Sequence, residues 1–363
     1  MKNLSDQKLL VSSPGRICLF GEHQDYLNLE VIASAISLRF YIEGKPRADR
    51  QFIIHLPDIG EVERFIPESE LPYLKKRDYL RSAVNILLRL GCRFQSGWEI
   101  KMHGDIPINA GTSSSSAMVV AWTRFLLEAC GRSDLAPHPE DLAELAHRAE
   151  VLEFNEPGGK MDHYTSALGG TVWIKFSTGL NITPLKASLG SFVLGDSLEK
   201  KDTTGTLSSV RQRVTMGLKT IKRQHPELDL QSISEPEFLR LSQNLPPEIR
   251  NPLHGAILNR DLTQEALKLF SQIVFNHHEF GRLLNEHQKV LRGLVGISTP
   301  KIDRMLQAAL KTGALGGKIN GSGGGGCMFA YAPGEPEKVA RAIEEEGGKA
   351  YIIKIDSGLR INT

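Results

Sequence analysis

The sequence predicts an α+β fold of two domains that meet near residue 175, and three observations lead to this prediction. Short runs of β-branched and aromatic residues dominate the first 104 residues, which is typical of strands. From residue 202 to residue 312 the patterns are mainly helical, and residues 327–355 resume as strand, helix and strand. Strands and helices grouped in separate blocks are typical of α+β proteins, in which helices cover one side of a sheet.

Each element follows from its local pattern. Apolar residues at helical spacing predict two helices that end at Gly91 and Gly131, and a third that begins with Pro139. These three helices span residues 77–91, 113–131 and 138–154. Strands are predicted at residues 11–20, 31–44, 51–56, 98–104, 171–176 and 191–197. The final unit comprises a strand at 327–333, a helix at 335–348 and a strand at 349–355.

Composition and charge exclude several classes of protein. The chain has 363 residues, and 44 basic residues against 42 acidic ones give a net charge of +2 without a basic stripe for nucleic acid. The four cysteines form no Cys-x-x-Cys pair, which indicates neither a disulfide framework nor a structural zinc site. The first ten residues lack the apolar region of a signal peptide, and no apolar run of about 18 residues occurs. We therefore expect a soluble, cytoplasmic protein that binds neither nucleic acid nor membranes.

A first polar cluster lies in residues 14–26, PGRICLFGEHQDY, where an apolar strand ends. This segment brings together one guanidinium, two carboxylates and one imidazole, from Arg16, Glu22, His23 and Asp25. Such groups can surround a polyhydroxylated ligand, because each sugar hydroxyl both donates and accepts hydrogen bonds. The alternative interpretation is a solvated turn between two strands.

A second cluster, residues 111–117 (GTSSSSA), directly precedes the second predicted helix. Unpaired N–H groups at a helix N-terminus carry partial positive charge and bind phosphate, and serine hydroxyls can ligate Mg²⁺. The alternative is an ordinary serine N-cap, which needs one serine rather than four. The segment is not a Walker A loop, because the pattern GxxxxGK[ST] is absent.

A third feature is the glycine segment, defined here as residues 313–327 (GALGGKINGSGGGGC), which holds eight of the chain's 34 glycines. Gly321, Gly323 and Gly326 satisfy the GxGxxG pattern, but a strand follows instead of a helix, so a dinucleotide site is not predicted. Glycines allow a backbone to approach a ligand closely with positive φ. The alternative is a flexible linker, although apolar segments flank the glycines on both sides.

In this order the three motifs resemble those of the GHMP small-molecule kinases, the superfamily of galactokinase, homoserine kinase, mevalonate kinase and phosphomevalonate kinase. The first motif is most similar to the galactokinase signature, whereas mevalonate kinases lack the pair that follows here as Asp25 and Tyr26. The resemblance spans nearly the whole chain. It implies an ATP- and Mg²⁺-dependent kinase that forms a sugar 1-phosphate. It also implies an N-terminal ribosomal-S5-like domain at residues 1–175 and a C-terminal ferredoxin-like domain at residues 176–363.

The resemblance further implies roles for individual residues. Gly159-Lys160-Met161-Asp162 matches a galactokinase motif whose aspartate is the general base, and Arg16 would pair with Asp162 and act on the γ-phosphate. Glu150 matches the Mg²⁺ ligand of the family, with Ser114 or Ser115 as its partner. The residues implied to bind the sugar are Arg16, Glu22, His23, Asp25, Gly159 and Asp162. Those implied to bind ATP are Gly111, Thr112, Ser113, Ser114, Ser115, Ser116, Gly323 and Gly324, with Ser115 and Glu150 on the metal.

Several positions depart from the galactokinase pattern and leave the substrate open. Gln24 and His163 replace other residues in the motifs, and Ser208 stands where the family has a sugar-contacting tyrosine. Lys160 is either solvated or a contact for a phosphate or for the carboxylate of a uronic acid. The expected substrate is galactose, another aldose, a uronic acid or a heptose. A mevalonate-type kinase and a non-catalytic sugar- or ATP-binding regulator are the alternatives, and we expect a monomer or homodimer.

Overall fold

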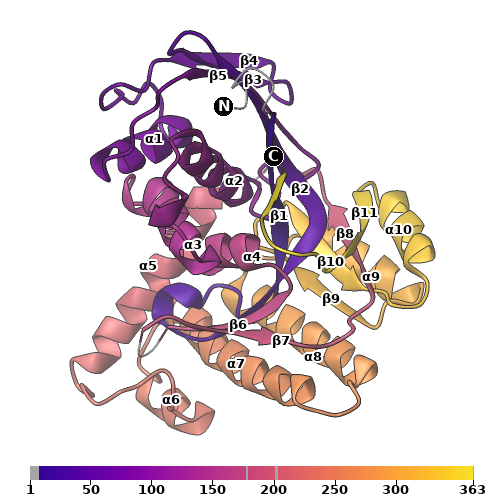
Figure 1. Cartoon of the computed structure of the whole chain (residues 1–363). Helices are drawn as coiled ribbons and strands as arrows, with labels where there is room; N and C mark the ends of the chain where they lie inside the picture. Colours follow the sequence, from indigo (N-terminus) through magenta and orange to yellow (C-terminus); the bar gives the residue numbers. More distant parts are fainter. Residues whose placement is uncertain (1–7, 177–178, 201–202, 363) are drawn as a thin grey trace.

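The protein is built on two sheets, and the computed structural model describes residues 8–176, 179–200 and 203–362. Figure 1 shows the first sheet rising through the upper part of the molecule and the second sheet beside its lower end. Asp202, where the predicted helical stretch begins, lies outside the described residues. In the described part, no helix combines the length and the apolar character needed to cross a membrane.

The first sheet is centred on two long antiparallel strands, β1 (Leu9–Phe20) and β2 (Val31–Arg47). Among the described residues it has eight strands, with the order β12-β1-β2-β5-β3-β4, and β6 and β7 continue from β2. Only β3 and β5 pair in parallel within this sheet as described. The other strands are β3 (Phe52–Leu56), β4 (Glu61–Phe65), β5 (Gly97–Gly104), β6 (Thr171–Lys175), β7 (Asn181–Leu185) and β12 (Arg360–Asn362).

Helices cover one side of the first sheet (Figure 1). They are α1 (Tyr79–Arg89), α2 (Ser114–Ala129), α3 (Pro139–His147) and α4 (Met161–Leu168), with a short 3-10 turn at Ser133–Leu135. Most residues of the central helix, α2, are buried, and its Trp122 and Phe125 rings stack in the core. This burial fixes the N-terminus of α2 relative to β1, so the serine loop has a rigid support.

The second sheet has the strand order β11-β8-β10-β9 and is antiparallel throughout. This is the order of the predicted ferredoxin-like unit. Its strands are β8 (Ser191–Asp196), β9 (Gly316–Ile319), β10 (Cys327–Tyr331) and β11 (Lys349–Lys354). The helices of this half are α5 (Thr203–Lys222), α6 (Glu235–Leu241), α7 (Pro247–Phe270), α8 (His277–Val290), α9 (Pro300–Lys311) and α10 (Pro336–Glu345), with a π-helical turn at Leu291–Val295.

The predicted α+β class is confirmed, as are the predicted strands that the structure describes. Sequence patterns missed four short strands, namely β4, β7, β9 and β12. Three of them, β4, β7 and β9, pair with the next or preceding strand of the chain, whereas β12 pairs with the distant β1. The predicted helix at 138–154 is interrupted, because α3 ends at His147 and a π-helical turn follows at Arg148–Leu152. Strands β7 and β12 lie beyond residue 175 yet complete the first sheet, and the domain boundary at that residue stays a prediction.

Candidate active site

One cavity, with a volume of about 360 Å³, brings most of the predicted site residues together. The predicted residues that line it are Arg16, Glu22, His23, Asp25, Gly111, Ser113, Ser114, Ser115, Ser116, Glu150, Gly159 and Asp162. Three others, Thr112, Gly323 and Gly324, are not among its lining residues. The N–H of Gly324 donates to the carbonyl of Ile297 at 2.8 Å, so this amide is already used within the protein.

Asp162 and Arg16 form an ion pair at the centre of the cavity. Arg16 lies on β1 and Asp162 in the first turn of α4, and Arg16 Nε donates to Asp162 Oδ1 at 2.7 Å. Arg16 also donates from Nη1 to the carbonyl of Gly111 at 2.6 Å, which ties this pair to the serine loop. Burial opposes the ionised form of Asp162, but the Arg16 charge outweighs it and lowers the pKa of this carboxyl below 3.8. Asp162 is therefore an anion at neutral pH.

The serine loop turns sharply before α2. Gly111 and Ser113 have φ angles of 89° and 60°, and the Ser113 side chain makes no capping hydrogen bond to the helix. The alternative interpretation, an ordinary serine N-cap, is therefore wrong for Ser113, whose left-handed backbone differs from the extended backbone of a capping residue. The N–H groups of the first helical turn have no partners within the helix and lie at the positive end of a 16-residue helix. They are suited to bind an anion.

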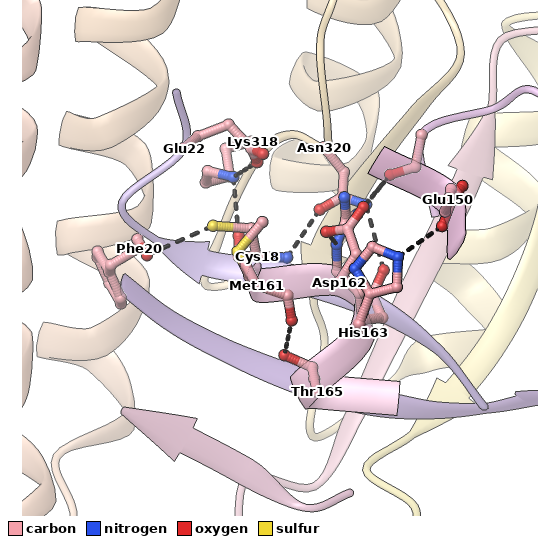
Figure 2. A network of polar contacts seen from close by, with 12 residues as sticks. Cys18, Phe20, Glu22, Glu150, Met161, Asp162, His163, Thr165, Lys318 and Asn320 are labelled. Atoms are coloured by element: carbon pink, nitrogen blue, oxygen red, sulfur yellow. Dashed lines mark hydrogen bonds and ion pairs between the residues drawn. The ribbon is translucent and has the colours of Figure 1, made fainter. Parts of the chain in front are cut away.

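Glu150 lies beside this loop, on the π-helical turn Arg148–Leu152. His163 Nε2 and Glu150 Oε2 are 2.7 Å apart, and both side chains are buried (Figure 2). Burial opposes ionisation of Glu150, but hydrogen bonds from His163 and from the hydroxyls of Ser115 and Ser116 lower its pKa below 4.5. A carboxylate and serine hydroxyls that converge in this way fit Mg²⁺, which binds through a few protein oxygens plus phosphate and water.

The opposite end of the cavity is acidic. Glu22, His23 and Asp25 follow directly after β1, where positive φ angles at Gly21 (93°) and His23 (61°) turn the chain back toward the cavity. Asp25 Oδ1 accepts the N–H of Tyr26 at 2.9 Å, and the Asp25 carboxylate lies directly against the Cα of Gly159. Burial and the nearby charge of Asp162 raise the pKa of Asp25 from 3.8 to about 6.

The glycine segment packs against the serine loop instead of forming a linker. Asn320 Nδ2 donates to the carbonyl of Gly111 at 2.8 Å, and Asn320 Oδ1 accepts the N–H of Cys18 at 2.9 Å. Gly321 has a φ of 78°, and a Cβ there would lie 2.6 Å from the carbonyl oxygen of Gly111. The N–H of Cys327 donates to the carbonyl of Ala110 at 2.7 Å. The close backbone approach predicted for these glycines is therefore an approach to another loop of the protein.

Sequence reasoning missed several residues of the site. His163 was noted only as a departure, and Lys318, which pairs with Glu22 at 2.8 Å, gave no signal because a lysine among glycines is usually solvated. Lys160 forms an ion pair with Glu144 at 2.8 Å. Ser208 is exposed, and its neighbour Leu207 lines the cavity.

The cavity also has an apolar end, which sequence reasoning missed. It is lined by Phe40, Leu56, Ile59, Met102, Ile106, Ile108 and Met118. The alternation of side chains along β2 and β5 could have indicated several of these residues.

Comparisons with known families match both halves of the chain. A family described as GHMP kinases N terminal domain matches residues 78–170, and one described as GHMP kinases C terminal matches residues 261–349. A galactokinase galactose-binding signature matches residues 2–46.

Known proteins of two activities are similar to the chain over nearly its full length. It is 31% identical to the mevalonate kinase of Thermococcus gammatolerans over 98% of each chain. It is 26% identical to the galactokinase of Mannheimia succiniciproducens over 96% of this chain and 92% of the other. Its fold matches that of Lactococcus lactis galactokinase complexed with galactose, with a TM-score of 0.81, 22% identity and coverage of 98% and 95%.

Proposed function

Because the chain belongs to the GHMP kinase family, we propose that it is an ATP-dependent kinase that phosphorylates the anomeric hydroxyl of a monosaccharide. The observation that carries this proposal is the position of the ion pair of Arg16 and Asp162. It lies between a loop suited to phosphate and an acidic end suited to hydroxyl groups. The galactokinase signature at residues 2–46 supports the choice of a sugar.

In the proposed reaction, the Asp162 carboxylate accepts the proton of the attacking sugar hydroxyl, whose oxygen forms a bond to the γ-phosphorus while the bond to the β-phosphate oxygen breaks. The products are a sugar 1-phosphate, ADP and a proton. Arg16 orients Asp162 and places positive charge where charge develops on the transferred group, and the serine-loop amides hold the phosphates. Ser115 and Glu150 would hold Mg²⁺, which neutralises phosphate charge when bound.

The charge of the acceptor end favours a neutral substrate. Among the described residues that line the cavity, the basic side chains apart from histidine are those of Arg16 and Arg77. Arg16 forms an ion pair with Asp162, and Arg77 forms one with Glu156. Asp25 adds a further carboxylate at the acceptor end. A substrate carboxylate would therefore face like charge, which disfavours mevalonate and uronic acids relative to uncharged sugars. Lys160 is engaged with Glu144, so it supports no contact with a uronate.

A mevalonate-type kinase is the second candidate, because a mevalonate kinase is 31% identical to this chain over 98% of each chain. The test is an ATP-consumption screen with galactose, arabinose, galacturonate, glucuronate, heptoses and mevalonate, with products identified by phosphorus NMR. We expect turnover of a neutral sugar and an anomeric phosphate. Turnover of mevalonate and of no sugar would overturn the proposal, and binding without turnover of any acceptor would favour the regulator.

Substituting Asp162→Asn tests the mechanism, because it keeps the shape of the side chain and removes the base. We expect kcat for the best acceptor to fall by at least about 100-fold, the scale of general-base catalysis. Binding of the sugar, measured by calorimetry, should change much less. A variant that retains the kcat of the parent protein would show that Asp162 is not the base.

A further inference from the structure

Lys318, on β9 in the glycine segment, is the most deeply buried cation of the described chain that the proposed mechanism leaves unused. Its side chain has no exposed surface, and all three N–H groups of its ammonium have acceptors. They are Glu22 Oε2 at 2.8 Å, the carbonyl of Cys18 at 2.8 Å and the carbonyl of Ile319 at 2.9 Å. A fully buried ammonium is costly unless it is paired and hydrogen-bonded in this way, so its presence calls for an explanation.

The partners of Lys318 belong to the first motif. Glu22 lines the acceptor end of the cavity, whereas Lys318 is not among the described lining residues and approaches Glu22 from behind. Figure 2 shows the Lys318 ammonium between the Glu22 carboxylate and the β1 backbone at Cys18. One side chain thus fixes both the carboxylate and the strand end that carries it.

The glycine segment also contacts the phosphate end of the cavity. Asn320, two residues along, binds the N–H of Cys18 and the carbonyl of Gly111, which belongs to the serine loop. The glycine segment therefore has two contacts of different purpose: Asn320 positions the phosphate end and Lys318 positions the acceptor end.

The charge of Lys318 also matters for what Glu22 can do. Glu22, Asp25 and Asp162 are three of the carboxylates that line the cavity, and Arg16 is paired with Asp162. The positive charge of Lys318 neutralises the negative charge of the Glu22 carboxylate, and the Lys318 ammonium donates one hydrogen bond to Glu22 Oε2. The rest of that carboxylate is left as an acceptor for hydroxyl hydrogens.

We propose that Lys318 is a positioning residue for the acceptor substrate, which acts through Glu22 and not through the nucleotide. The inference rests on the proposed function, because it takes the acceptor to be a molecule with hydroxyl groups at this end of the cavity. It gives the glycine segment a part in substrate recognition that is separate from its contact with the phosphate loop.

A double-mutant cycle tests the proposal, with Lys318→Met, Glu22→Gln, and the two combined. Lys318→Met keeps the chain length and removes the charge, and we expect it to raise KM for the acceptor at least tenfold while KM for ATP changes less than twofold. Since Lys318 acts through Glu22, the combined variant should have the same acceptor KM as Glu22→Gln alone, within about twofold. Lys318→Arg, which keeps the charge, should recover part of the acceptor affinity. The matched control is Lys289→Met, which removes an exposed lysine paired with Glu286 and should change neither KM.

The outcomes separate the possible failures. If Lys318→Met does not fold, the combined variant decides, because removing both charges leaves no unpaired buried ion. An acceptor KM in the combined variant that exceeds that of Glu22→Gln by more than about threefold would overturn the inference, as would a parallel rise in KM for ATP. The proposed function fails separately, in the acceptor screen of the unsubstituted protein, and the cycle is then measured with whichever acceptor that screen identifies.

Discussion

Two carboxylates in the cavity, Asp162 and Asp25, have opposite electrostatic environments. The Arg16 guanidinium holds the pKa of Asp162 below its ordinary value, whereas burial and the Asp162 charge raise that of Asp25 to about 6. There is therefore a range of pH below about 6 in which Asp162 is ionised and Asp25 is neutral. An arrangement of this kind keeps the proposed base ionised and makes the neighbouring carboxylate costly to bury.

Substituting Asp25→Asn should stabilise the protein at high pH. A carboxyl whose pKa is higher in the folded state contributes stability that is complete below its unfolded pKa, near 3.8, and is lost as pH rises through about 6. At pH 8 the ionised Asp25 therefore destabilises the folded state, and we expect Asp25→Asn to raise the free energy of unfolding by about 3 kcal/mol. The gain should shrink toward zero near pH 4. Urea denaturation of both proteins across this range measures it, and a gain independent of pH would contradict the assignment.

At the scale of elements, the site depends on two loops that meet. The chain after β1 carries Asp25, and the chain before α4 carries Gly159, whose Cα the Asp25 carboxylate touches. Neither loop has regular structure of its own beyond the short 3-10 turn at Asp25–Leu27, so each depends on the other for its position. A side chain at residue 159 would separate them.

We expect Gly159→Ala to raise KM for the acceptor at least about fivefold, or ~1 kcal/mol, because a Cβ at this position overlaps the Asp25 carboxylate. KM for ATP should be nearly unchanged. Steady-state kinetics measures both values. The matched control is Gly293→Ala, where an added Cβ has open space around it. Equal effects of the two substitutions would show that the contact between Asp25 and Gly159 does not position the acceptor.

Local sequence predicted those parts of the fold and site that local patterns determine. The helices and longer strands follow from the spacing of apolar residues, and the clusters around Arg16 and Ser114 form the cavity as expected. Strand β12 could not be predicted, because its three residues acquire strand structure only by pairing with β1 at the other end of the chain, and β9 is only four residues long and lies among glycines. Lys318 was missed for the same reason, since its burial depends on Glu22, almost 300 residues away. The left-handed backbone at Ser113, which makes no capping hydrogen bond, could not be predicted because it has no signature in a run of serines.

At the scale of the whole molecule, one buried arginine joins the two ends of the described chain. Arg39 on β2 donates to Ser12 on β1, and to Asp356, Ser357 and Gly358 just before β12. Its side chain is almost completely buried. These hydrogen bonds hold the last strand of the described chain against β1, so the first sheet includes residues from both ends.

Substituting Arg39→Met should lower the free energy of unfolding by about 3 kcal/mol, because it removes the donor to Asp356 Oδ2 and to the carbonyl groups of Ser12, Ser357 and Gly358. The matched control is Arg360→Met, which removes an exposed arginine paired with the same Asp356 and should cost less than about 1 kcal/mol. Chemical denaturation compares the two. Similar losses in both variants would show that the buried hydrogen bonds of Arg39 add little.

The contacts of Lys318 and Asn320 with Cys18 also determine when the site can form in the cell. Lys318 and Asn320 lie 300 and 302 positions after Cys18 in the chain. At about 5–20 residues per second, a ribosome needs roughly 15–60 s to synthesise that interval. During this time β1 and Glu22 have emerged without the ammonium that they bury. A nascent chain that stalls before residue 318 can contain the serine loop and Asp162, but its acceptor end is unfinished, so this end of the cavity is completed late in biosynthesis.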